Sequence, residues 1–118
     1  MVITLPWPSS KLSPNARLHW RAKVGPKQDA RRIAGWCAVT AAGFSERRDD
    51  LRAFTDPIAI TVTFCPPDKR RRDRDNMIAS TKHAFDGVAD AFGIDDYRFH
   101  PTYKIGEPVK GGCVSIEI

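Results

Sequence analysis

Several features that define common protein classes are missing from this 118-residue chain. Its three cysteines, Cys37, Cys65 and Cys113, are odd in number and far apart, and no CxxC pair or suitably spaced histidine offers a zinc site. A disulfide framework is therefore not expected. The pattern favours reduced thiols, which is typical of a cytoplasmic protein.

Long hydrophobic runs are missing as well. The longest apolar stretch, IAGWCAVTAAGF from Ile33, has the length of a core helix, whereas a membrane span needs about 20 residues. The first ten residues, MVITLPWPSS, do not combine a basic segment with a following apolar one, as a secretory leader would. We therefore expect no membrane partner. With no repeat and no low-complexity linker, residues 1–118 are expected to form a single domain.

Acidic residues are scarce in the first third of the chain, where Asp29 is the only one before residue 45. The cations of the same stretch are Lys11, Arg17, Arg21, Lys23, Lys27, Arg31 and Arg32. The whole chain carries a formal net charge of +5. An uneven distribution of positive charge indicates which molecules a protein binds, and it does not indicate the fold. Nucleic acid is the polyanion that a basic domain most often binds.

Hydrophobic periodicity predicts the elements of an α+β fold. The expected strands are residues 2–5, 58–64, 98–105 and 113–118, and the expected helices are residues 27–42 and 76–92. A loop is expected over residues 9–26 and a charged connector over residues 45–56. The predicted architecture is a small mixed β-sheet with two main helices, in the broad α/β class.

The helix expected over residues 76–92 has two distinct faces. At 100° per residue, its apolar side chains fall within roughly 100° of one another, while Asp75, Lys82 and Asp86 lie on the opposite side. The apolar stripe consists of Met77, Thr81, Ala84, Phe85, Val88 and Phe92. The charged row then faces solvent or a ligand.

One segment, PPDKRRRDRDN over residues 66–76, joins a basic run to carboxylates at the end of an expected strand. Its candidate phosphate-binding cations are Lys69, Arg70, Arg71 and Arg72, to which Arg17, Arg21 and Lys23 of the basic first third are added. Asp73 and Asp75 offer oxygens that suit Mg²⁺, for which Mn²⁺ can substitute. Metal-assisted phosphodiester hydrolysis needs such carboxylates together with cations at the phosphate.

Two carboxylates rarely hold a hard cation, so a third ligand is expected from elsewhere in the fold. Asp95 and Asp96, just beyond the second helix, are the candidates. Asp86 is separated from Asp75 by about 16 Å of helix and is less suitable. The side chain of Lys82 is long enough to reach a phosphate bound over this face.

The same residues also allow structural roles without any catalytic function. The aspartates of the DxDN string can be helix N-caps, and Lys82 with Asp86 can be an ordinary i,i+4 pair. The chain would then be a non-catalytic basic DNA-binding module. A nuclear-targeting role for KRRR is a weaker alternative, since the string lies inside a fold. We expect His19, His83 and His100 to have surface or core roles. Trp7 and Trp20 are expected to pack against the core, although the basic residues around Trp20 would also suit phosphate contact combined with base stacking.

The order of these segments resembles the RusA family of Holliday junction resolvases. ITLPWPSS near the start, PDKRRRDRDN, the acidic pair after the second helix and KGG before the last β-run carry the resemblance along nearly the whole chain. It implies a homodimeric, magnesium-dependent endonuclease that recognises four-way DNA junctions by shape and nicks two strands symmetrically. It implies Asp73, Asp75 and Asp96 as metal ligands, with Asp95 as the alternative third ligand and Arg72 in support.

One departure from the family pattern concerns the catalytic lysine. In the pattern DxDNxxK the last position is occupied here by Ala79, and Lys82 follows three residues later. Asp86 keeps the KxxxD spacing that comes after the lysine. Lys82 is therefore assigned as the catalytic lysine, on the same helical face as Asp75.

Overall fold

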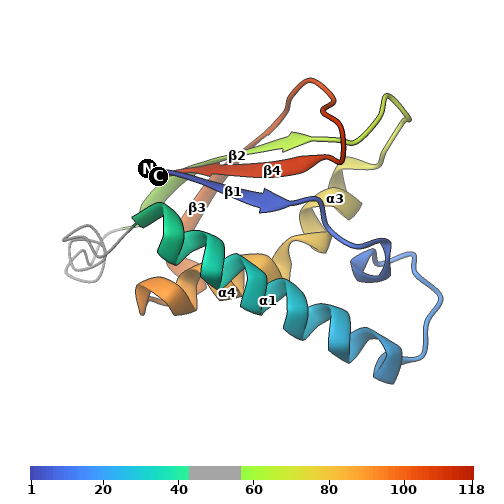
Figure 1. Ribbon diagram of the computed structural model, residues 1–118, viewed down its shortest axis with the longest axis horizontal. Helices are drawn as coiled ribbons and strands as arrows, with labels where there is room; N and C mark the ends of the chain where they lie inside the picture. The colour runs from blue at the N-terminus through green and yellow to red at the C-terminus, as the bar shows by residue number, and fades with distance from the viewer. Residues whose placement is uncertain (43–56) are drawn as a thin grey trace.

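The computed structural model describes residues 1–42 and 57–118 (Figure 1). Its strands are β1 (Val2–Pro6), β2 (Ile58–Cys65), β3 (Phe99–Ile105) and β4 (Cys113–Glu117). Its α-helices are α1 (Trp20–Ala42), α3 (Arg74–Ser80) and α4 (Lys82–Phe92). Short 3-10 helices cover Ser10–Leu12 and Asp96–Arg98. The predicted α+β class is confirmed, and the expected connector over residues 45–56 lies outside the described residues.

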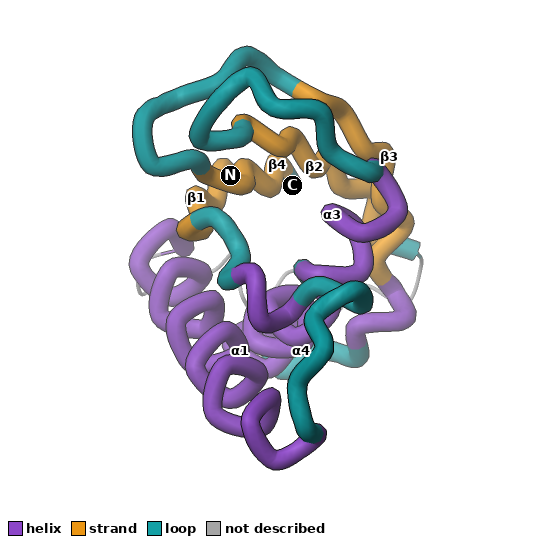
Figure 2. The backbone as a smooth tube through the Cα atoms, turned by 90° about the vertical axis from the view of Figure 1, so that its right-hand side faces the viewer, coloured by secondary structure: helices purple, strands orange, loops and turns teal. Residues whose placement is uncertain are grey.

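The four strands form one mixed sheet in the order β1-β4-β2-β3, in which β2 and β3 are parallel and the other pairs are antiparallel. Side chains of β2 alternate as its sequence predicts, with Ile60, Val62 and Phe64 buried against the helices. Helices α1 and α4 cover one face of this sheet, as Figures 1 and 2 show from two directions. The chain ends lie side by side, because the amino group of Met1 donates to the carbonyl oxygen of Ile118 at 3.0 Å.

Close packing of α1 on α4 depends on small residues. Ala34 and Ala38 of α1 are buried, and a Cβ atom added to Gly87 of α4 would lie 2.0 Å from the carbonyl oxygen of Arg31. The side chain of Arg31 bridges the same helices, since its Nη2 atom donates to Asp90 at 2.9 Å. Gly87 thus sets how closely the two helices approach.

Helix α1 begins seven residues earlier than the sequence suggested, which corrects the loop expected over residues 9–26. The sequence predicts a helix that begins after Pro26, but Pro26 lies inside the helix. The actual start is capped by His19, whose Nδ1 atom accepts from the backbone N–H of Arg21 at 3.2 Å. Pro26 has no backbone N–H, so α1 lacks one hydrogen bond at this position. The proline ring lines a pocket together with Leu5 and Trp7.

The second expected helix is divided at Thr81 into α3 and α4, which corrects the single helix predicted over residues 76–92. The hydroxyl of Thr81 donates to the carbonyl oxygen of Ile78, and that of Ser80 donates to Asn76, both at 2.7 Å. Such side-chain bonds compete with the helical ladder. The predicted apolar stripe still holds, because Met77, Val88 and Phe92 are buried in the core.

Candidate functional site

The loop from β2 to α3 places the predicted carboxylates at a helix start. Asp73 is the N-cap of α3, and its Oδ1 atom accepts from the backbone N–H groups of Asp75 and Asn76 at 2.9 and 3.3 Å. The capping role considered for these aspartates is therefore confirmed for Asp73. Asp75 is exposed in the first turn, and within the described residues its carboxylate has no ion pair.

Arg72 organises this loop from within. Its Nη1 atom lies 3.0 Å from the Oδ1 atom of Asp68 and donates to the carbonyl oxygens of Asp68 and Arg70, both at 3.1 Å. Its guanidinium carbon is 5.6 Å from the centre of the Trp7 ring, and its side chain is only 19% exposed. Arg72 thus shapes the loop, while Lys69, Arg70 and Arg71 are exposed. The role of Asp68 was missed, although its i,i+4 spacing to Arg72 could have revealed it.

Substituting Arg72 should change the acidity of Asp68. Arg72, with help from Arg70, lowers the pKa of the Asp68 carboxyl from 3.8 to about 2. A carboxyl with a lowered folded-state pKa stabilises the fold above its unfolded pKa, and this contribution disappears as the pH falls from about 4 towards 2. In Arg72→Gln, NMR titration should show the pKa of Asp68 rising towards its ordinary value. Lys69→Gln, from the same loop, is the control and should leave that pKa near 2.

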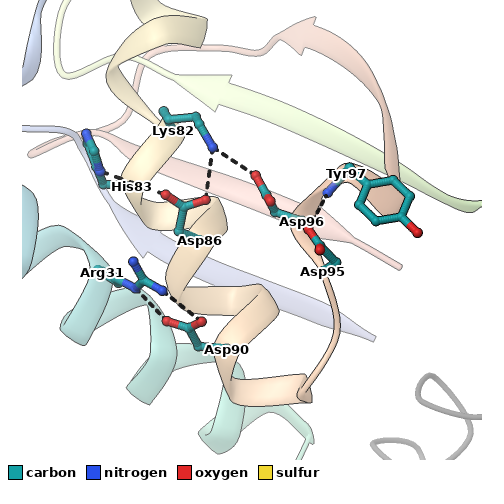
Figure 3. A network of polar contacts seen from close by, with 8 residues as sticks. All are labelled: Arg31, Lys82, His83, Asp86, Asp90, Asp95, Asp96 and Tyr97. Atoms are coloured by element: carbon teal, nitrogen blue, oxygen red, sulfur yellow. Dashed lines mark hydrogen bonds and ion pairs between the residues drawn. The ribbon is translucent and has the colours of Figure 1, made fainter.

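A second cluster lies where α4 begins. Figure 3 shows Lys82 between two carboxylates, with its Nζ atom 3.0 Å from the Oδ1 atom of Asp86 and 2.8 Å from the Oδ2 atom of Asp96. The contact with Asp96 joins residues from two elements, which sequence spacing alone could not establish. Lys82 remains 61% exposed, so its ammonium is still accessible to a ligand.

The charges in this cluster stabilise one another. Hydrogen bonds to Asp96 and then to Asp86 raise the pKa of Lys82, and the bond from Lys82 lowers the pKa of Asp96. Lys82 is therefore a cation at neutral pH and is unsuited to act as a base. Burial, and then the charge of Lys27, lower the pKa of His83, so that its 3.9 Å contact with Asp86 is not an ion pair at pH 7.

The predicted metal ligands do not all converge. Across residues 1–42 and 57–118, no three His, Cys, Asp or Glu side chains are close enough together to hold a metal ion. Asp73 caps α3 and Asp96 pairs with Lys82. Asp95 caps the 3-10 helix that follows α4, where its Oδ1 atom accepts from the backbone N–H of Tyr97 at 3.5 Å. Carboxylate oxygens such as those of Asp73, Asp95 and Asp96 are the type of ligand that hard cations prefer.

The basic first third places its predicted contacts at the start of α1. Arg17 and Arg21 are exposed and Lys23 is half-buried. Trp20 is 65% exposed, which corrects the expected packing role, whereas Trp7 does pack, edge-on to Phe64 at 6.3 Å between ring centres. The predicted surface or packing roles of the histidines agree with exposed His19 and His100 and with the partly buried ring of His83.

Comparison with known proteins identifies a related protein, but the description of that protein names no activity. No family model matches the chain. A protein of Xylella fastidiosa strain Temecula1, described as an uncharacterized protein, is 43% identical over 106 residues. The match covers 86% of this chain, and the chain spans 65% of the length of that relative. In the part of the chain that the structure describes, no helix is both long and apolar enough to cross a membrane.

Proposed function

We propose that this protein is a magnesium-dependent endonuclease that nicks branched DNA, with four-way junctions as its substrate. The proposal rests on the resemblance of its segments to the RusA family and on the arrangement of its charged residues. Because one chain carries one set of carboxylates and resolution needs two symmetric nicks, the proposal includes a homodimer. A cytoplasmic location belongs to the same proposal.

The observation that best supports this function is the contact between Lys82 and Asp96. Both residues were assigned to the site from the sequence. Lys82 begins α4, whereas Asp96 begins the 3-10 helix that follows the end of α4. Their Nζ and Oδ2 atoms are nevertheless 2.8 Å apart. A protonated lysine held beside carboxylates is suited to stabilise negative charge on a phosphate as the bond to the leaving oxygen breaks.

Asp73, Asp75 and Asp96 are the residues that would hold the magnesium ion. When bound, the ion would activate water and polarise the phosphoryl oxygen. Asp75 is the carboxylate most available for this role, since it is exposed and does not cap α3. The exposed side chains of Lys69, Arg70 and Arg71 would hold the DNA backbone beside it.

A second candidate function is a basic DNA-binding module without catalysis. It is favoured by the absence of a three-ligand group among the described residues and by the pairing of Lys82 with two aspartates. Both functions predict binding to a junction, but only the first predicts strand cleavage.

A nicking assay on a synthetic four-way junction distinguishes the two functions. The endonuclease should cut two opposed strands in magnesium and leave the DNA intact in EDTA. Binding in EDTA without any cleavage in magnesium or manganese would leave the binding module as the function. Sedimentation of the same complex should show two protein chains per junction, whereas a monomer would contradict paired nicking.

Lys82→Ala should impair catalysis far more than stability. Lys82 is mostly exposed and faces away from the buried stripe, so Tm should change by only a few degrees. Single-turnover cleavage should fall by roughly 10²-fold, because the cation at the reacting phosphate is lost. Lys104→Ala, which removes another exposed lysine, is the charge control and should cut at close to the parental rate. Equal rates for both variants would return Lys82 to the role of a surface ion pair.

A further inference from the structure

Trp20 is exposed in a setting that no core packing explains. It is the first residue of α1, its side chain is 65% exposed, and a guanidinium and a second aromatic ring lie close to its indole. We propose that Trp20 is a stacking platform for an unpaired or end-exposed DNA base. This inference rests on the DNA binding in the proposed function and adds the kind of DNA feature recognised.

The ring of Trp20 is held by its own neighbours in the chain. The guanidinium carbon of Arg21 lies 5.3 Å from the centre of the Trp20 ring, and the ring of His19 lies 5.6 Å away at an interplanar angle of 33°. These contacts limit the orientations of the indole while most of its surface stays in water. A partly ordered, accessible aromatic ring loses little freedom when a base stacks on it.

The charge around Trp20 fits a polynucleotide. Arg17, Arg21 and Lys27 are exposed close to it in sequence, and the first turn of α1 contains no acidic residue. A base that stacks on an aromatic ring brings its flanking phosphates with it, so cations interleaved with the ring contribute to the same contact.

A DNA molecule that contacts both basic regions would have to cross one end of the protein. The start of α1 and the loop between β2 and α3 both lie at the right in Figure 1 and face the viewer in Figure 2, with the loop at the upper edge and the start of α1 at the lower edge. That loop carries the exposed cations Lys69, Arg70 and Arg71. A branched DNA held there exposes bases at its crossover, where stacking is interrupted.

A membrane surface is a poorer fit for this ring. Although Leu18 and Val24 are each 40% exposed, the guanidinium of Arg21 and the ring of His19 lie beside the Trp20 ring. Stacking on a base keeps the same guanidinium beside a phosphate and water.

The test compares two equally exposed tryptophans of α1 by single substitution. Trp36 is 67% exposed on the same helix, so Trp36→Ala is a matched control for Trp20→Ala. The probes are a single-stranded oligonucleotide and a four-way junction with 2-aminopurine at the crossover, both measured in EDTA. Quenching of the probe by the parent protein is expected, together with an affinity loss of about 5- to 150-fold in Trp20→Ala only. Trp20→Phe should retain part of the affinity.

The outcomes separate this inference from the proposed function. If the protein quenches the probe through Trp20 but cuts no junction, the stacking role of Trp20 is supported and the proposed endonuclease activity is excluded. If the parent protein cuts the junction but does not quench the probe, the stacking role of Trp20 is overturned and the endonuclease activity is supported. The same conclusion follows if the parent cuts the junction and binds DNA with the same affinity as Trp20→Ala. Equal losses in the two alanine variants also overturn it, as does Trp20-dependent binding to phosphatidylserine vesicles without binding to either DNA. Circular dichroism melting confirms that each variant is folded.

Discussion

The Asp75→Asn variant is expected to bind a four-way junction in EDTA at least as tightly as the parent while its magnesium-dependent nicking falls by two orders of magnitude or more. The substitution removes a negative charge near the exposed arginines, so repulsion of DNA decreases. A neutral amide is a weaker ligand for a hard cation than a carboxylate. Binding measured by fluorescence anisotropy and single-turnover nicking on the same junction give the two quantities.

Two controls make this result interpretable. Asp29→Asn removes an exposed carboxylate from α1 and should leave the nicking rate near that of the parent. The Tm of Asp75→Asn should fall by only a few degrees, because an exposed charge in the first turn of a helix contributes about 0.3–1 kcal/mol. A folded Asp75→Asn protein that nicks at the parental rate would remove Asp75 from the site.

Gly87→Ala should destabilise the protein more than any exposed substitution discussed above. The new methyl group would lie 2.0 Å from the carbonyl oxygen of Arg31, which is backbone and cannot rotate away. Helices α1 and α4 must therefore separate, at a cost of about 3 kcal/mol in the free energy of unfolding. Thermal melting should show a Tm lower by roughly 10 °C or more.

Gly25→Ala is the matched control within the same helical layer. Apart from its two chain neighbours and the nearby backbone of its own helix, no atom lies within 4 Å of the position where its Cβ would be placed. Alanine is favoured over glycine inside a helix by about 0.5–1 kcal/mol, but Pro26 disfavours helical backbone for a preceding residue that has a Cβ atom. The Tm should therefore stay within a few degrees of the parental value. Equal stability of the Gly87→Ala and Gly25→Ala proteins would show that the approach of α1 to α4 is looser than this structure has it.

The sequence predicted those elements in which the hydrophobic pattern is strong. The alternation along β2 and the apolar stripe from Met77 to Phe92 both correspond to buried faces. Boundaries were predicted less well because local bonds decide them. Capping by His19 starts α1 before Pro26, and the hydroxyl of Thr81 interrupts the helix between α3 and α4.

The candidate site was predictable in residue type but not in arrangement. Spacing along a helix placed Lys82 opposite the core, and its exposure agrees. Its contact with Asp96 depends on how the chain turns after α4, which no periodicity encodes. For Trp20 the sequence allowed both packing at the edge of the core and stacking on a base, and the 65% exposure of the side chain removes the packing role.

The sheet order has a consequence for synthesis on the ribosome. Among the strands of residues 1–42 and 57–118, β4 comes last in sequence yet lies between β1 and β2, and it is the strand with which β1 pairs. At roughly 5–20 residues per second, β1 leaves the ribosome many seconds before β4 is made. During that interval β1 and β2 expose unpaired edges and the apolar side chains that β4 later helps to cover. Nascent chains stalled before Cys113 should therefore be bound by chaperones and cleaved by proteases, whereas chains released beyond Glu117 should resist both.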